Sequence, residues 1–231
     1  MNSIELVVFD IAGTTVRDNG NVAKAFIAAF ESFGYTIKKE DAQEVMGFRK
    51  KDAIRILLDK LFPDININKD ELIEKIHNVF TTNMISFYKN DADLQPLPFA
   101  EDVFLWLKKK GVKLALNTGF TKAITDTMLQ KLEWKSGSTV DYVISSDEVA
   151  QGRPNPDMIR AIMKKLDIKN PSSVAKVGDT EVDVEEGRHA GCGLVVSVTT
   201  GAYNRRRLEE YHPDHIIDSL SELPNIIESV M

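Results

Sequence analysis

Apolar residues run without interruption from Leu6 to Phe9 and stop at Asp10. A short apolar run with no polar alternation is typical of a strand buried on both faces of a parallel sheet. The next polar stretch, a glycine and two threonines at 13–15, ends the strand pattern. We therefore expect Asp10 at the carboxyl end of a buried strand, which is where open α/β sheets bind ligands.

Between residues 17 and 93 the apolar positions follow a helical period, and no strand is evident. Three stripes of this kind indicate a small helical bundle, the third on a long helix that starts near Lys69. Polar stretches at 17–21 and 90–94 flank the bundle, which suggests an inserted cap. The stripes are Val22, Phe26, Phe30 and Phe33; Ile54, Leu57, Leu58 and Leu61; and Leu72, Ile76, Val79, Phe80 and Phe87.

From Pro96 onward helical and strand patterns alternate, and repeated βα units give a parallel sheet covered on both faces. The sequence therefore predicts a Rossmann-like α/β core of residues 1–16 and 94–231, with an all-helical cap of residues 17–93 inserted. Expected strands cover 112–116, 142–145, 174–177, 194–198 and 216–217. Expected helices cover 100–110, 121–132 and 182–190, with one entered through Asn155 and Pro156 and one ending at Val230.

The overall composition is that of an ordinary soluble protein, with 43% apolar and 28% charged residues. A net charge of −6 and the lack of a basic stripe argue against nucleic-acid binding. The basic triplets at 108–110 and 205–207 are interpreted as solvated helix ends. No apolar run approaches the roughly 20 residues that span a bilayer. One cysteine, Cys192, and an N-terminus unlike a signal peptide lead us to expect a cytoplasmic protein.

Residues suited to binding an anion follow two of the later strands. Thr118 and Gly119 combine a hydroxyl with free backbone N–H groups at a helix start. Arg153 stands before two prolines, which stiffen the backbone, and its guanidinium can bind two phosphate oxygens. Taken alone, each stretch also suits helix capping or a surface arginine.

Asp179 ends an apolar strand, and Asp183 lies one turn into the next helix. Together with Asp10 these carboxylates supply the hard oxygen ligands that Mg²⁺ prefers. Helix capping explains one of the two later aspartates but not both beside Asp10. All these groups should meet at one edge of the sheet, where Mg²⁺, a nucleophilic carboxylate, a threonine and an arginine suit phosphoryl transfer.

These motifs resemble those of the haloacid dehalogenase superfamily, and the helical insertion is similar to its C1-type cap. The resemblance implies that Asp10 is the nucleophile and forms an aspartyl-phosphate that water then cleaves. It further implies a Mg²⁺ site made by Asp10, the Ala12 carbonyl, Asp179 and, in a supporting position, Asp183. The residues implied to bind substrate are Gly13, Thr14, Thr118, Gly119 and Arg153.

Ala12 departs from the phosphatases of that superfamily, which carry an aspartate there as general acid and base. Such help is worth about 10²–10⁴-fold in rate. An alanine in this motif, together with DEVAQGRPNPDMI and KVGDTEVDVEEGRHAG, is similar to the phosphonoacetaldehyde hydrolase (phosphonatase) family. That family uses a cap lysine to form a Schiff base, and Lys50 is in register, with Lys51 as the alternative. An imine withdraws electrons from the P–C bond, so the leaving group departs as an enamine.

Three positions differ from the phosphonatase pattern: Ala53 replaces a histidine, Phe120 replaces a tyrosine, and the linker at 17–22 lacks a cysteine. We therefore expect the protein to bind a small phosphate or phosphonate substrate. We expect the protein itself to be a monomer or a homodimer. A phosphate monoesterase of the phosphoglycolate-phosphatase type is the alternative enzyme. A phospho-accepting receiver domain and a pseudoenzyme that binds through its cap are the alternatives of another class.

Overall fold

The computed structural model describes residues 3–230, and six strands within them form one parallel sheet. The strand order is β3-β2-β1-β4-β5-β6. The chain adds strands on one side of β1 first (β2, β3) and then on its other side (β4, β5, β6). A crevice forms at the carboxyl ends of the strands where the order reverses in this way. The strands are β1 (Leu6–Phe9), β2 (Lys113–Thr118), β3 (Tyr142–Ser145), β4 (Val174–Gly178), β5 (Leu194–Val198) and β6 (His215–Ile217).

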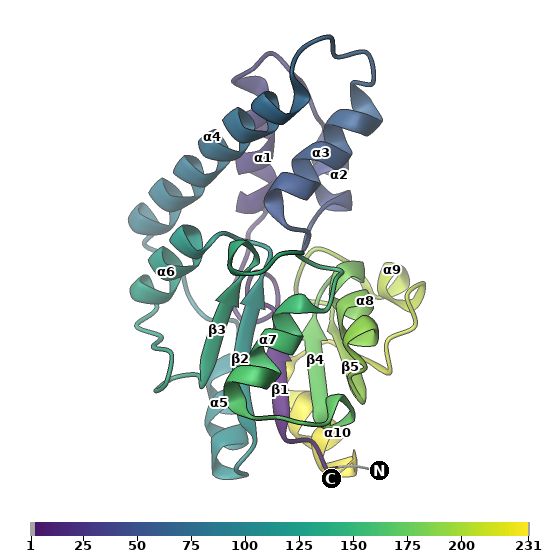
Figure 1. Cartoon of the computed structure of the whole chain (residues 1–231). Helices are drawn as coiled ribbons and strands as arrows, with labels where there is room; N and C mark the ends of the chain where they lie inside the picture. The colour runs from purple at the N-terminus through teal and green to yellow at the C-terminus, as the bar shows by residue number, and fades with distance from the viewer. Residues whose placement is uncertain (1–2, 231) are drawn as a thin grey trace.

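Helices cover both faces of the sheet, as the sequence pattern predicts (Figure 1). Successive side chains of a strand point to opposite faces, so Val7 and Phe9 pack into one apolar cluster while Leu6 and Val8 pack into another. The first cluster includes side chains of α5 (Ala100–Lys109), α6 (Lys122–Lys131) and α10 (Leu223–Val230). The second includes side chains of α7 (Asp157–Leu166) and α8 (Glu181–Ala190).

Four helices form the inserted cap above the carboxyl edge of the sheet (Figure 1). The longest starts where the sequence predicts, because the Asn68 side chain accepts a hydrogen bond from the Glu71 N–H, 3.3 Å away, and caps the first turn. The rings of Phe26 and Phe80 meet inside the bundle with centroids 4.5 Å apart. The cap helices are α1 (Asn21–Glu31), α2 (Lys39–Glu44), α3 (Lys50–Leu61) and α4 (Lys69–Asn90).

The chain leaves and re-enters the core at one place. The Arg17 N–H donates to the Gln95 carbonyl (3.2 Å), and the Leu97 N–H donates to the Thr15 carbonyl (2.8 Å). Val16 and Pro96 form an isolated antiparallel bridge between these bonds. The expected domain boundaries at 16/17 and 93/94 fall close to this paired segment.

Three local features differ from the sequence expectations. Strand β2 runs on to Thr118, and α7 begins at Asp157 instead of being capped by Asn155. The Asn155 amide donates to the Gly152 carbonyl (3.0 Å) and stabilises the preceding loop. A short helix outside the expected helical ranges, α9 (Arg205–Glu209), is capped by Asn204 and begins with the second basic triplet, which agrees with the helix end expected there. The short 3₁₀ helices are η1 (Ser146–Glu148), η2 (Pro171–Ser173) and η3 (Leu220–Glu222).

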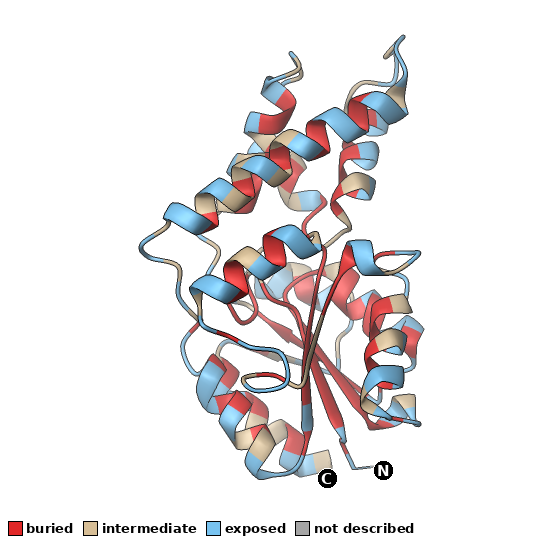
Figure 2. Cartoon of the chain, turned by 60° about the vertical axis from the view of Figure 1, so that its left-hand side comes forward, coloured by how far each residue is buried: buried red, intermediate tan, exposed pale blue. Residues whose placement is uncertain are grey.

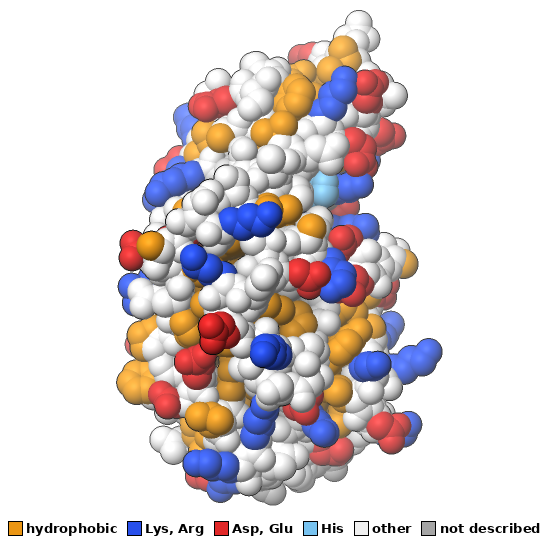
Figure 3. All heavy atoms as spheres, turned by 90° about the vertical axis from the view of Figure 1, so that its left-hand side faces the viewer, with side chains coloured by type: hydrophobic (Ala, Val, Ile, Leu, Met, Phe, Trp, Pro, Cys, Tyr) orange, Lys and Arg blue, Asp and Glu red, His pale blue; other side chains and the backbone are white. Residues whose placement is uncertain are grey.

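Burial is concentrated in the sheet and on the inner faces of the helices (Figure 2). On the face drawn in Figure 3, acidic and basic side chains are interspersed and form no basic stripe. None of the helices within residues 3–230 is long and apolar enough to span a membrane.

Candidate active site

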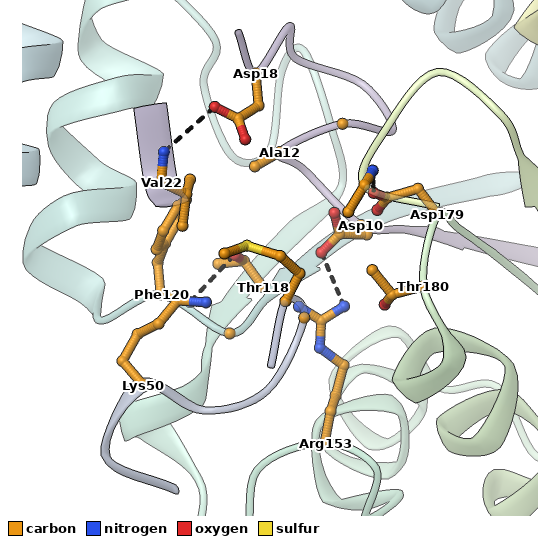
Figure 4. A pocket seen from close by; sticks show the side chains of 15 residues that line it. Asp10, Ala12, Asp18, Val22, Lys50, Thr118, Phe120, Arg153, Asp179 and Thr180 are labelled. Carbon is orange, nitrogen blue, oxygen red and sulfur yellow. Dashed lines mark hydrogen bonds and ion pairs between the residues drawn. The ribbon is translucent and has the colours of Figure 1, made fainter. Parts of the chain in front are cut away.

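The structure brings Asp10, Thr118 and Asp179 together at the carboxyl ends of β1, β2 and β4 (Figure 4). They line a cavity of about 30 Å³ between the core and the cap. The sheet accounts for this convergence, because Phe9 at the end of β1 pairs with Leu116 of β2 and Val177 of β4. The single edge predicted for these groups is thus a consequence of strand register.

Asp179 is held tightly on the side of the cavity next to Gly13. The Ala202 N–H donates to its Oδ2 (2.6 Å), and the Thr14 hydroxyl donates to its Oδ1 (3.2 Å). Gly13 has φ of 92°, and a Cβ there would lie 2.7 Å from Asp179 Oδ2, so only glycine fits. Thr14, expected among the substrate-binding residues, is completely buried and orients Asp179 from behind the cavity.

Arg153 occupies the wall of the cavity below Asp10 (Figure 4). Its Nη1 lies 2.8 Å from Asp10 Oδ1 and also pairs with Asp183 Oδ1. Burial disfavours the charge of Arg153, but Asp183 and Asp10 outweigh burial and raise its pKa above the ordinary value. The buried Nε has no hydrogen-bond partner within residues 3–230.

Asp183 is the centre of a buried ionic network on the core side of Arg153. Its Oδ1 lies 3.0 Å from Lys176 Nζ, and its Oδ2 accepts from the Thr180 hydroxyl (2.6 Å) and N–H (3.2 Å). Burial works against the charge of Asp183, but Lys176 and Arg153 together lower its pKa to about 2. Asp183 therefore caps α8 and orients Arg153, and both its oxygens are already engaged.

The rest of the network was not recognised from the sequence. Lys176 lies 3.2 Å from Glu186 and donates to the side-chain oxygen of Asn117, Oδ1 (2.6 Å). The side-chain nitrogen of Asn117 donates to both Glu186 oxygens (2.9 Å each). Lys176 and Glu186 are completely buried. The available signal was a lysine inside the otherwise apolar run of β4, since a buried charge requires partners.

Asp10 and Asp179 are the carboxylates that fit a divalent cation. Burial raises the pKa of both, and their mutual repulsion raises it further for Asp179. The Asp10 Oδ2 has no hydrogen-bond partner among the described residues. Residues 3–230 contain no group of three or more His, Cys, Asp or Glu side chains arranged as a metal site. Two carboxylates and the Ala12 carbonyl still suit Mg²⁺, which usually retains several waters.

Lys50 extends from the start of α3 into the opposite side of the cavity (Figure 4). It is only 4% exposed, with Nζ 5.1 Å above the Phe120 ring and 5.6 Å above the Phe26 ring. Burial and, next, the charge of Arg153 lower its pKa to about 8. Of the two candidate lysines, Lys51 instead pairs with Glu74 at the surface (2.5 Å).

The cap loop that carries Lys50 rests directly on the core. An added Cβ at Gly119 would lie 2.4 Å from the Phe48 carbonyl oxygen, and one at Gly47 would lie 2.3 Å from a Val182 methyl group. Arg49 donates to the Ala150 carbonyl from above the loop that holds Arg153 (3.0 Å). Arg49 and Lys51, the charged neighbours of Lys50 in the sequence, are directed to other partners, Ala150 and Glu74.

Other residues around Lys50 are mainly apolar. Ala53 is completely buried, and Phe120 is packed against Tyr88 of α4, with ring centroids 6.2 Å apart. Asp18, in the polar linker after β1, also lines the cavity and was not singled out from the sequence. Its position depends on the path of the linker, for which the sequence pattern carries no signal.

A family model described as haloacid dehalogenase-like hydrolase matches residues 7–197. The chain belongs to the haloacid dehalogenase-like hydrolases. The match covers Asp10, Thr118, Arg153 and Asp179, which line the cavity from the core. The chain is therefore a hydrolase of this family, with the parallel sheet and the inserted helical segment that its motifs predict.

Three known proteins are similar to this hydrolase. It is 30% identical to a phosphonoacetaldehyde hydrolase of Bacteroides fragilis, over 100% of this chain and 98% of the relative. It resembles the structure of a phosphonoacetaldehyde hydrolase-like protein from Oleispira antarctica, with a TM-score of 0.85, 25% identity and coverage of 99% and 93%. A putative phosphoglycolate phosphatase from Lactobacillus delbrueckii shares the fold, with a TM-score of 0.78, 20% identity and coverage of 98% and 99%.

Proposed function

We propose that this hydrolase cleaves the P–C bond of a small phosphonate that carries an aldehyde, after an imine forms on Lys50. The observation that carries this proposal is the position of Lys50, a buried amine with a pKa of about 8 that lines the same cavity as Asp10. An exposed lysine, with a pKa of roughly 10.4, is almost wholly charged at neutral pH and is a poor nucleophile. Burial leaves a useful fraction of Lys50 neutral.

The core side of the cavity supplies the phosphoryl chemistry. In the proposed reaction, Asp10 Oδ2 attacks phosphorus and forms an aspartyl-phosphate, which water then hydrolyses to release phosphate. The Arg153 guanidinium, the Thr118 hydroxyl and the Gly119 N–H would hold the phosphoryl oxygens. Thr118 accepts a hydrogen bond from the Phe120 N–H (3.2 Å), so its own hydroxyl proton is available for the substrate.

Asp10, Asp179 and the Ala12 carbonyl are the groups we propose to hold Mg²⁺, with Asp183 supporting them through Arg153. When bound, Mg²⁺ would offset negative charge on the phosphoryl group and on the two carboxylates. Thr14 and Ala202 would keep Asp179 in place during turnover through the two hydrogen bonds already described.

The cap side of the cavity supplies the leaving-group chemistry. The neutral Lys50 amine adds to the aldehyde carbon and gives a carbinolamine. The carbinolamine hydroxyl takes up one proton and leaves as water, so that a protonated imine remains. When the P–C bond breaks, its electron pair moves toward the imine nitrogen and produces an enamine. No leaving-group oxygen needs a proton in this step, which is why Ala12 can replace the aspartate of the phosphatases. Protonation of the enamine carbon and hydrolysis then return the free lysine.

The small cavity supports a substrate of few atoms. A volume of about 30 Å³ is only a little more than a single water requires. The cap must therefore open to admit even a two-carbon phosphonate, and closure removes water from the reacting groups. Because the cap covers Asp10, the site is also unsuited to the open docking face that a receiver domain needs.

A phosphate monoesterase is the second candidate function. The apolar residues Ala53 and Phe120 around Lys50 favour it, since neither can move a proton during imine formation. In that case Lys50 would be a cation that binds a substrate carboxylate or phosphate.

The test is phosphate release from phosphonoacetaldehyde and from a panel of small phosphate esters, with Mg²⁺ present. Borohydride added during turnover should leave a reduced adduct on Lys50, which mass spectrometry would locate. Lys50→Arg should abolish phosphonate cleavage and trapping, whereas Lys51→Arg should retain both because arginine can keep the pair with Glu74. Turnover of esters only, with Lys50 unmodified, would establish the monoesterase instead.

A further inference from the structure

Asp18 lies on the linker between β1 and α1 and is one of the carboxylates that line the cavity (Figure 4). Its Oδ1 accepts hydrogen bonds from the Asn21 N–H (2.8 Å) and the Val22 N–H (3.4 Å) at the start of α1. Its Oδ2 has no hydrogen-bond partner among the residues that the structure describes. One oxygen therefore fixes the side chain, while the other is free.

The charged groups around Asp18 come from several elements. Lys50 of α3 and Lys24 of α1 attract its negative charge, which also helps to raise the pKa of Tyr88 of α4. Asp10, Asp179 and Arg153 line the same cavity from the core. Asp10 and Asp179 are committed to the phosphoryl end, and Arg153 cannot release its proton. Of the three aspartates that line the cavity, Asp18 is thus the one left to exchange protons at Lys50.

Asp18 also stands between two cavities. Met46, Ala202 and Asp18 line the inner cavity and, on their other side, a second cavity of about 190 Å³. The second cavity is bordered by Gly20, Lys39 and Gln43 of the cap. A group in this position can exchange protons with solvent while the cap remains closed over Lys50.

We propose that Asp18 transfers protons to and from the reaction at Lys50, and that the second cavity connects it with solvent. This inference rests on the imine chemistry proposed above. It supplies the acid–base group that Ala53 and Phe120 cannot provide. Burial raises the pKa of the Asp18 carboxyl, and the hydrogen bonds from Asn21 and Val22 only partly oppose this effect, which favours the acid form that a proton donor needs.

The proton balance of the step is simple. Lys50 adds to the aldehyde and gives a neutral carbinolamine. Protonated Asp18 then donates its proton to the carbinolamine hydroxyl, the C–O bond breaks, and water leaves as the C=N bond forms. The products are a cationic imine and the Asp18 carboxylate, so one neutral acid and one neutral adduct become an ion pair. Hydrolysis of the product imine returns the proton to Asp18 by the reverse path.

Asp18→Asn separates proton transfer from the structural role of this residue. An asparagine oxygen can accept the same two backbone hydrogen bonds, and asparagine is as good as aspartate at a helix start. The variant should therefore fold normally but lose the exchangeable proton. Asp52→Asn is the matched control, because Asp52 is an exposed aspartate in the first turn of the same helix as Lys50.

The experiment measures how fast Lys50 forms an imine with acetaldehyde, trapped with cyanoborohydride and quantified by mass spectrometry between pH 6 and 9. We expect Asp18→Asn to slow labelling at pH 7 by roughly 10²-fold, the scale of general acid–base help. Asp52→Asn should match the parent protein. A purely electrostatic role predicts the opposite change, because loss of the Asp18 charge lowers the pKa of Lys50 and speeds labelling.

Equal or faster labelling in Asp18→Asn would overturn the inference, whatever the natural substrate is. Absence of Lys50 labelling in the parent protein would overturn it together with the imine chemistry. Normal labelling without phosphate release from phosphonoacetaldehyde would remove only the proposed substrate, and the comparison of labelling rates would still decide the role of Asp18.

Discussion

The backbone of Gly119 in the core contacts the backbone of Phe48 in the cap so closely that an added Cβ would lie 2.4 Å from the Phe48 carbonyl oxygen. Gly119 also directly follows Thr118, the last residue of β2. Closure of the cap and the shape of the phosphoryl site therefore depend on one missing methyl group.

Gly119→Ala should hold the cap open without unfolding the core. A displacement of about 1 Å in such a site can reduce turnover by roughly 10²-fold. Lys50 would become hydrated, so its pKa should rise from about 8 toward the ordinary value. The pH dependence of Lys50 labelling by an amine reagent would measure that rise. An unchanged Lys50 pKa in Gly119→Ala would show that the core accommodates the methyl group.

The rate of phosphonate turnover should increase with pH up to about 8, because the reaction needs the neutral Lys50 amine. Above this pH, Lys50 should cause no further increase in the rate. Initial rates between pH 6 and 9, with Mg²⁺ saturating, would show the rise. Phosphate ester hydrolysis, if the protein carries it out, should lack this limb. If the rate of phosphonate turnover did not change with pH around pH 8, the protonation state of Lys50 would not control the rate.

Lys50→Met should stabilise the protein at neutral pH while abolishing imine formation. The folded-state pKa of Lys50, about 8, lies below its ordinary value of 10.5, so the unfolded chain binds the proton more tightly. The parent protein therefore gains stability as pH rises from 8 to 10.5, and below pH 8 it is destabilised by up to about 3 kcal/mol. Urea unfolding at pH 7 and pH 10 should show a gain for Lys50→Met that is larger at pH 7. Equal gains at both pH values would contradict a desolvated lysine.

Mg²⁺ should raise the thermal stability of the parent protein and should do so much less for Asp179→Asn. Burial and repulsion by Asp10 raise the pKa of Asp179, so the folded state carries unfavourable negative charge that a cation relieves. Removing the charge should also stabilise the metal-free protein. Thermal unfolding with EDTA and with Mg²⁺ would measure both effects. Asp64→Asn, a surface change, serves as the control; a full Mg²⁺ response in Asp179→Asn would place the metal elsewhere.

Lys176→Met should destabilise the fold by about 3–5 kcal/mol, because it leaves buried Glu186 without its paired cation and removes one of the two cations that pair with Asp183. The double variant Lys176→Met/Glu186→Gln should recover part of this loss, since a neutral glutamine can still bond to Asn117. Urea midpoints of the three proteins would test the order. A single variant as stable as its parent would mean that water or relaxation replaces the lysine.

The sequence predicted the parts of the site that depend on periodicity. Asp10, Thr118 and Asp179 follow apolar strands, and parallel pairing then places them at one edge. The start of α4 at Lys69 was also correct because a capping asparagine precedes a regular stripe.

The parts that depend on tertiary contacts could not be predicted. The role of Thr14 as a partner of Asp179 requires two segments 165 residues apart to meet. Asp18 lies in a linker whose polar composition fits any exposed turn. Lys176 is an intermediate case: its place in an apolar strand signalled a buried ion pair, but not that Glu186 and Asp183 would provide it.

The paired backbone at residues 15–17 and 95–97 has a consequence for how such a protein can arise. The two ends of the insertion are already adjacent, so a short turn could replace the four helices and leave every strand connected in the same order. A single recombination event at this junction can therefore add, remove or exchange the covering helices. The sheet with its aspartates and the helices with Lys50 can be inherited as separate modules, and a new lid can change the substrate without a new catalytic core.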